Sequence, residues 1–150
     1  MKIVVQRVRS AQVDVKGKTI SNIGIGLLIL AGVHVEDNLD DLQWLAHKVV
    51  QLRIFPNEEG DFDKSIKDIN GDILVVSQFT LYASTRKGNR PSFISAARPE
   101  KAEPFMEKWL EMLQAELGKN VYYGIFGADM QVSLMNDGPV TIVMDSKNRE

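Results

Sequence analysis

Apolar and polar side chains alternate through the first third of the chain, the pattern that predicts β-strands. Residues 2–8 form one such run, and residues 11–16 alternate small or apolar with polar side chains, as in a strand with one face in water. Gly17-Lys18 predicts a hairpin into residues 19–23. The aliphatic run at residues 24–33 suits a central strand. This third of the chain is therefore predicted to be β-sheet.

Two later stretches carry apolar side chains at helical spacing. Asn38 is a good N-cap with an aspartate three residues on, and the apolar positions that follow predict a helix from about Leu39 to Leu52. A second helix is predicted to end before Gly118, with Pro99 and Pro104 both suited to its first turn. Its apolar stripe consists of Phe105, Met106, Trp109, Leu110, Leu113 and Leu117.

The segments around these elements are predicted from turn chemistry. Residues 53–70 contain proline, asparagine, glycine and several acidic side chains, which predicts an irregular excursion over the surface. The acids lack the glycine and glutamate spacing of an EF-hand, so this stretch does not match a calcium loop. The strand-like runs 130–135 and 140–144 flank Asn136-Asp137-Gly138-Pro139, which predicts a hairpin between them.

The totals indicate one soluble domain of mixed α/β class over residues 1–150, with β-sheet and two main helices. The absence of cysteine excludes disulfides, thiol nucleophiles and thiolate metal sites. The apolar run at the N-terminus is too short for the core of a signal peptide, and no apolar segment is long enough to span a membrane, so we expect a cytoplasmic protein. The net charge of −2 argues against broad coating of nucleic acid, DNA included, but not against gripping one RNA end.

The stretch from Gly71 to Phe93 combines the features of a binding site. Residues 73–76 predict a strand buried on both faces, and small or neutral polar side chains follow where that strand ends, with Phe79 and Tyr82 as stacking surfaces among them. Such an arrangement suits a substrate that carries a flat base. A strand followed by a solvated loop is an equally good interpretation of the same residues.

The loop at residues 84–92 holds the one concentrated positive patch of the chain. Its cations are Arg86, Lys87 and Arg90. They are the candidates for binding the phosphates of an RNA end.

Standard catalytic schemes find no support in the sequence. His34 and His47 are the only histidines, and neither belongs to a metal-binding or catalytic triad pattern, so we assign both structural or solvated roles. No nucleophile elbow, Walker loop or dinucleotide-binding glycine pattern is present, and we expect neither a metal nor a cofactor. The remaining polar groups are neutral hydrogen-bonding side chains, which can orient a substrate and stabilise an oxyanion. They suit an ester that is already reactive.

Several segments, in order, resemble one family. Val5-Gln6-Arg7-Val8, Ser77-Gln78-Phe79-Thr80-Leu81-Tyr82-Ala83, residues 85–93 and Asn136-Asp137-Gly138-Pro139-Val140-Thr141 are similar to the bacterial D-aminoacyl-tRNA deacylases, also called D-tyrosyl-tRNA deacylases. The resemblance runs from Met1 to about Asp145. One departure is the sequence Asp61-Phe62-Asp63-Lys64-Ser65, where the family has a Lys-Met-Asn-like turn.

The resemblance implies a homodimer whose sheets carry helices on one side and whose active sites lie at the subunit boundary. One wall of each site would consist of Ser77, Gln78, Phe79 and Thr80. A Gly138-Pro139 pair with a cis peptide bond would enter from the partner, braced by Arg7. The implied substrate is the ester that joins a D-amino acid, or mischarged glycine, to the terminal adenosine of tRNA. Gly138-Pro139 would exclude L-amino acids by crowding the face that an L side chain needs.

Two questions stay open at the level of sequence. A non-catalytic module that binds RNA ends and a general small-molecule esterase would use the same residues. Thr80 has no histidine or lysine near it in sequence to remove its proton, so we expect it to position the substrate, with the neighbouring ribose hydroxyl assisting water.

Overall fold

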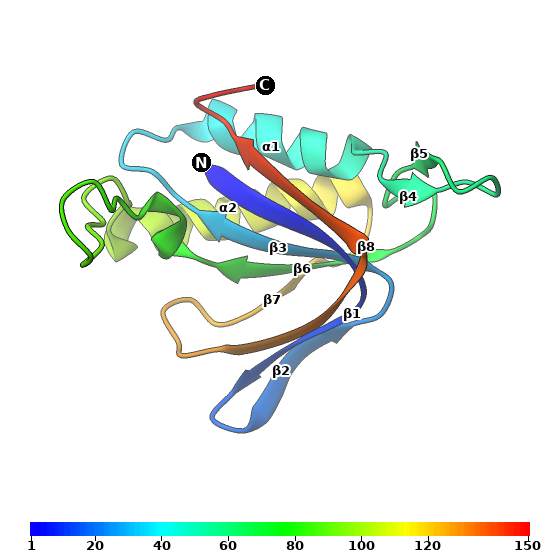
Figure 1. Cartoon of the computed structure of the whole chain (residues 1–150), viewed down its shortest axis with the longest axis horizontal. Coiled ribbons are helices and arrows are strands. Elements are labelled where there is room, and N and C mark those ends of the chain that lie inside the picture. The colour runs from blue at the N-terminus through cyan, green and yellow to red at the C-terminus, as the bar shows by residue number, and fades with distance from the viewer.

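The computed structural model describes all 150 residues as a strongly bent sheet with two helices on one side (Figure 1). In chain order the elements are β1 (Lys2–Val15), β2 (Lys18–Ile23), β3 (Gly26–Gly32), α1 (Leu39–Gln51), β4 (Phe55–Pro56), β5 (Phe62–Lys64), β6 (Asp72–Ser77), the 3-10 helix η1 (Phe79–Tyr82), α2 (Pro99–Leu117), β7 (Tyr122–Tyr123) and β8 (Gln131–Asp145). The main sheet has the order β2-β1-β3-β6-β7, and β8 pairs with β1. The predicted mixed α/β class is confirmed.

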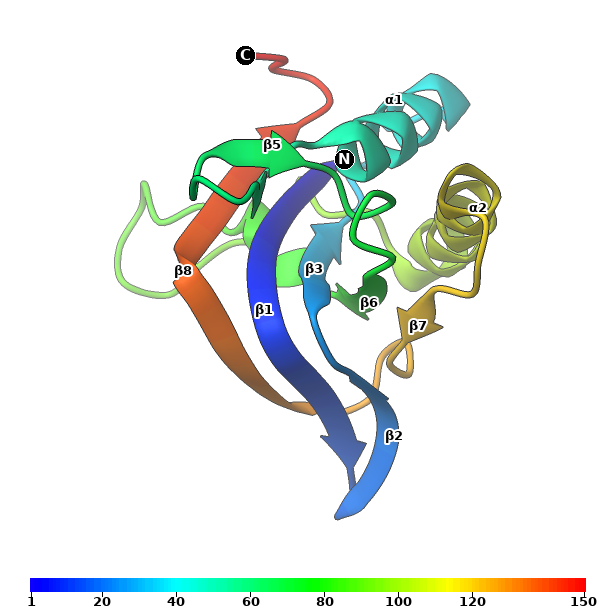
Figure 2. The same cartoon turned by 90° about the vertical axis from the view of Figure 1, so that its right-hand side faces the viewer.

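Strand β1 connects the two halves of the sheet. It is one continuous strand, not the two that the sequence predicts. Its first half pairs antiparallel with β3 and its second half with β2, while β8 follows its other edge from end to end. Because β2 and β3 pair with successive parts of one strand, the sheet bends between them, as both views show (Figures 1 and 2). The strands β3, β6 and β7 are parallel to one another.

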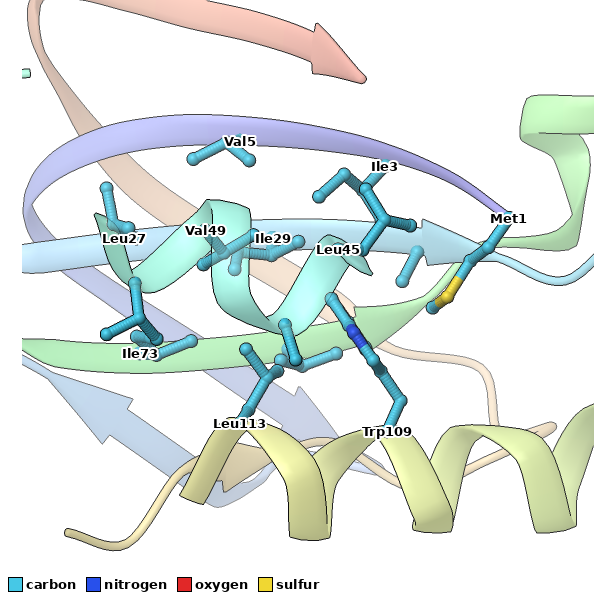
Figure 3. Close-up of a cluster of buried hydrophobic side chains, with 14 of the residues drawn as sticks. Met1, Ile3, Val5, Leu27, Ile29, Leu45, Val49, Ile73, Trp109 and Leu113 are labelled. Carbon is cyan, nitrogen blue, oxygen red and sulfur yellow. The ribbon is translucent and has the colours of Figure 1, made fainter. Parts of the chain in front are cut away.

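Apolar side chains fill both faces of the central strands. The larger cluster lies between the sheet and the helices, where Trp109 and Leu113 of α2 point at the sheet (Figure 3). A smaller cluster lies on the opposite face, inside the bend. Along β6, Ile73 and Val75 belong to the first cluster and Leu74 to the second. The prediction that this strand is buried on both faces is confirmed.

Both predicted helices are present and pack against each other on one side of the sheet (Figure 2). Asn38 caps α1 as predicted, in a capping box with Asp41. The second helix, α2, begins at Pro99 and ends at Leu117, and the residue that caps it, Gly118, has a φ of 80° in the left-handed region. Pro104 lies beyond the first turn, so that part of the prediction is wrong. No helix combines the length and the apolar character needed to cross a membrane.

The predicted hairpin at residues 136–139 is wrong. Residues on both sides of Gly138-Pro139 belong to the single strand β8 and pair with the single strand β1. Asn136 pairs with Val8 and Thr141 with Gln6, so residues 137–140 lie opposite one residue of β1, in a bulge. The turn residues do redirect the chain, but the pairing with β1 resumes beyond them, so the chain does not reverse.

The excursion over residues 53–70 contains more order than predicted. Residues 55–56 and 62–64 pair as the small hairpin β4–β5. The side chain of Asn57 accepts hydrogen bonds from two backbone N–H groups of the turn, and Arg53 pairs with Asp63 across the base of the hairpin. This hairpin lies at the same end of the molecule as the bend in β8 (Figure 1).

We predict that Asp41 makes stability depend on pH in acid. Burial alone would raise the pKa of Asp41, but hydrogen bonds from Lys147 Nζ (2.8 Å) and from the backbone N–H of Asn38 (2.9 Å) outweigh it and lower the pKa to about 2. A lowered folded-state pKa stabilises the protein above pH 4, and that contribution disappears as the pH falls from about 4 to 2.

The measurement is the free energy of unfolding between pH 2 and 7 for wild type and Asp41→Asn. The wild type should lose roughly 2 kcal/mol more than the variant over the acid range, from the shift in pKa. Equal acid sensitivity in the two proteins would contradict this assignment. Asp40→Asn, an exposed neighbour, is the matched control.

Candidate functional site

The end of β6 carries the polar side chains that the sequence predicts there. Ser77 is the last residue of the strand, and the backbone N–H of Gln78 donates to the carbonyl of Ala31 on β3 at 2.7 Å. A Cβ on Gly32 would lie 2.8 Å from the carbonyl oxygen of Gln78, so glycine permits this close approach. The chain then turns directly into η1, which places Phe79 and Thr80 on the surface.

The hydroxyl of Thr80 has one side-chain partner, Gln78. The Gln78 amide donates to Thr80 Oγ1, so this contact positions the hydroxyl and removes no proton from it. An amide is no general base. The local chemistry therefore provides neutral donors and acceptors, as the sequence predicts.

A cavity of about 580 Å³ opens beside these residues. Ser77, Gln78 and Phe79 form one side of it, and the start of α2 with residues 126–132 forms much of the rest. Phe93 packs edge-to-face on Phe79, with ring centroids 5.0 Å apart, at the cavity rim. The lining is mostly apolar, and its polar side chains are those at the end of β6 together with Arg98 and Asp129. This is the composition of a site for a flat, partly apolar ligand.

Most of this lining does not follow from the sequence. Met106, Phe126 and Met130 come from segments far from residue 77 in the chain, and the helical stripe predicts Met106 only as a core residue. Met106 is both a core residue and a lining residue, because the apolar stripe of α2 borders the cavity as well as the core. Tyr82, predicted as a stacking surface, does not line the cavity. Its ring contacts His34, with centroids 5.0 Å apart, and burial raises the pKa of its hydroxyl.

The basic loop projects from the rim of the cavity. Two hydrogen bonds between Ser84 and Ser92, of 2.8 and 2.9 Å, close its base just before Phe93. Its three cations are exposed and form no ion pair within the chain: Arg86, Lys87 and Arg90. They are free to contact a charged ligand.

Arg7 lies beneath the bulge of β8. It is only 8% exposed, and its Nε donates to the carbonyl of Asp137 at 3.0 Å while Nη1 donates to the carbonyl of Ile54 at 2.6 Å. A Cβ on Gly138, whose φ is 128°, would come within 3.0 Å of Arg7 Nη2. Arg7 therefore contacts the Gly138-Pro139 segment of its own chain, and that peptide bond is cis.

Asn136 supports the same bulge from its other end. Its Oδ1 accepts from the backbone N–H of Val140 at 2.9 Å, and its Nδ2 donates to Thr141 Oγ1 at 3.1 Å. The sequence indicates only a turn former at this position. The bulge is therefore held by side chains at both ends, and Gly138 and Pro139 themselves are exposed.

Within one chain, the cavity and the bulge are separate. Neither Gly138 nor Pro139 lines the cavity beside Ser77. The structure thus brings the predicted residues together as two sets, one at the end of β6 and one on β8.

The histidines take no part in either set. His34 Nδ1 accepts from the backbone N–H of Glu36 at 3.1 Å, and His47 lies 3.4 Å from Glu116 on the exposed side of the helices. No cluster of three or more His, Cys, Asp or Glu side chains has the geometry of a metal site.

Known sequences match almost the whole length of this chain. Residues 4–145 match the model of a family described as D-Tyr-tRNA(Tyr) deacylase. The chain is 55% identical over its full length, and over the full length of the relative, to a D-aminoacyl-tRNA deacylase of Flavobacterium psychrophilum. It is equally similar, with the same coverage, to one of Bacteroides thetaiotaomicron.

Solved structures share the fold. One described as a c-Myc DNA unwinding element binding protein superposes with a TM-score of 0.89 at 45% identity, covering 97% of this chain and 98% of the other. A probable eukaryotic D-amino acid tRNA deacylase superposes with a TM-score of 0.82 at 15% identity, covering 95% and 97%, which shows the fold alone. On the match over residues 4–145 and the full-length identity, the chain belongs to the D-Tyr-tRNA(Tyr) deacylase family.

Proposed function

We propose that this protein hydrolyses the ester between a D-amino acid, or mischarged glycine, and the 3′-terminal adenosine of tRNA. The observation that carries the proposal is the apolar cavity at the end of β6, with neutral hydrogen-bonding groups on one wall and unpaired cations beside it. Such a cavity can hold a nucleoside, and the cations can hold the phosphates that precede it. The compartment we propose is the cytoplasm, where charged tRNA is made.

The chemistry we propose needs positioning more than a strong base. An aminoacyl ester is already activated, so holding it and its attacking water in the right geometry lowers much of the barrier. Ser77 and Gln78, which line the cavity, can orient the ester and stabilise the developing oxyanion, and Thr80 lies beside the cavity, bonded to Gln78. The ribose hydroxyl next to the ester then assists water, since the hydroxyl of Thr80 is bonded to an amide and not to a base.

A homodimer would complete this site. The outer edge of β8 is unpaired over a long strand, and it carries the exposed apolar side chains of Leu134, Met135 and Val143. An edge of this kind is a template for pairing with another chain. Because Gly138 and Pro139 are exposed on β8 and absent from the chain's own cavity, we propose that they enter the cavity of the partner subunit.

In this position the segment would select for chirality by exclusion. A rigid backbone that crowds one face of the bound α-carbon leaves no room for an L side chain, while a D side chain projects away and glycine has none. Arg7 and Asn136 hold that backbone in place. One site would then accept many D-amino acids and also glycine.

The decisive prediction is multiple turnover on charged tRNA. Catalytic amounts of protein should release free D-tyrosine from D-tyrosyl-tRNA, act on glycyl-tRNA, and cleave L-tyrosyl-tRNA far more slowly. Stoichiometric binding without release would leave only an RNA-binding module. Comparable rates on D-amino-acid methyl esters would instead indicate a general esterase. Duplex DNA, added as a competitor, should not inhibit.

For Thr80 we predict a modest loss on substitution. If the hydroxyl only positions the substrate, Thr80→Ala should lower the rate roughly 3- to 10-fold, the size of one hydrogen bond, and Thr80→Ser should retain most of the activity. A terminal 2′-deoxyadenosine should cost more than the substitution. Complete loss in Thr80→Ala, or a trapped aminoacyl ester on Thr80, would show covalent catalysis instead.

The basic loop should make a small number of phosphate contacts. Arg86→Ala combined with Lys87→Ala should weaken tRNA binding and reduce the slope of log affinity against log salt by about 0.7 to 0.9 for each phosphate that the loop no longer neutralises. The preference for D over L substrates should stay as in wild type. Lys18→Ala combined with Lys67→Ala, two exposed lysines elsewhere without ion pairs, is the matched control. An unchanged salt slope in the loop variant would remove these cations from the tRNA site.

A further inference from the structure

The guanidinium of Arg7 has a fourth neighbour that the sequence does not indicate. Besides its hydrogen bonds to the carbonyls of Asp137 and Ile54 and an ion pair with the Asp137 carboxylate at 3.6 Å, its Cζ lies 5.6 Å from the ring centroid of Phe62. This distance is within the range of a cation–π contact. Two of these neighbours, Ile54 and Phe62, come from the segment around the β4–β5 hairpin.

The hairpin is built to hold Phe62 at this place. Phe62 pairs with Pro56 across the hairpin, and Arg53 bonds both the carboxylate and the backbone carbonyl of Asp63, the next residue. The ring itself is 57% exposed and belongs to neither apolar cluster. Its contact with Arg7 therefore cannot be explained as core packing.

The position of Arg7 matters because its other side touches the bulge. Nη2 lies where a Cβ on Gly138 would meet it at 3.0 Å, and Nε holds the carbonyl of Asp137. A side chain with five donors in a rigid plane cannot tilt without changing these contacts. The hairpin and the Gly138-Pro139 segment are thus coupled through one guanidinium, although they do not follow one another in sequence.

We propose that Phe62 is a positioning residue for chiral selection: its ring contacts the Arg7 guanidinium and fixes it against the Gly138-Pro139 segment. The inference rests on the proposed function, since it concerns the discrimination between D and L esters. Phe62 does not touch the reacting atoms and acts only through Arg7. Its effect should therefore fall on the ratio of D to L rates, because the groups that orient the ester lie at the end of β6.

The test is single-turnover deacylation of D-tyrosyl- and L-tyrosyl-tRNA by wild type, Phe62→Leu and Phe62→Tyr. Leucine keeps apolar bulk but removes the π face, and tyrosine keeps the face. Phe62→Leu should lower the ratio of D to L rates roughly three- to fivefold, the size of an exposed cation–π contact. Phe62→Tyr should keep the wild-type ratio. Ile25→Ala, another exposed apolar side chain at 61%, is the matched control and should keep the wild-type ratio.

The outcomes separate the two proposals. A wild type that does not deacylate D-tyrosyl-tRNA overturns the proposed function and this inference with it. A wild type that does so, with an unchanged ratio in Phe62→Leu, overturns the inference alone. An equal fall of the ratio in Phe62→Leu and Phe62→Tyr also overturns it, because the ring face would then not be the cause. Equal loss on both substrates would show a merely structural role and count against it in the same way.

Discussion

The pairing of β1 with β8 is the interaction on which the rest of the structure depends. Strand β8 runs antiparallel along one edge of β1, and the other edge of β1 is divided between β3 and β2. The helices and the main core lie on the half paired with β3, and the smaller cluster fills the bend beyond it. The pairing shifts register twice, between Gln6 and Val8 and between Val8 and Ser10, and Arg7 lies opposite the larger bulge at residues 137–140. The buried cation takes the place of the missing ladder bonds, donating to a carbonyl within the bulge.

The same pairing separates the two sets of site residues. Ser77 and Gln78 end a strand in the middle of the sheet, with two strands between it and β8 in the order β8-β1-β3-β6. The start of β8 does reach the cavity, where Val132 lines it, but Gly138 and Pro139 lie farther along the strand and do not. The proposed dimer resolves this, because a second copy can present β8 to the cavity from outside. A rigid bulge on an exposed strand is well suited to that role, since it needs no rearrangement to enter a neighbour.

The sequence predicts those features that local chemistry decides. The cap at Asn38, the left-handed Gly118 and the double burial of residues 73–76 follow from one element and its immediate neighbours. The path of residues 136–139 does not, because Asp-Gly is a good hairpin turn in isolation and only the continued pairing of β8 with β1 decides otherwise. The cavity lining at Phe126 and Met130 depends on how distant segments meet, so no local pattern predicts it. Residues 77–80 are predictable as a set because they are contiguous.

At residues 61–65, local hydrogen bonds fix the backbone, while the contact of the aromatic side chain depends on the long-range fold. By sequence this stretch is only a difference from the family, inside an acidic excursion. In the structure its backbone is fixed by local bonds, namely the Asn57 turn and the Arg53–Asp63 pair, yet its one aromatic ring reaches a residue of β1. A buried guanidinium needs every partner it can obtain, because desolvating a charge is costly. Its neighbours therefore come from whichever segments can approach it. In this way Phe62, in a surface hairpin, contacts a residue that holds the Gly138-Pro139 segment.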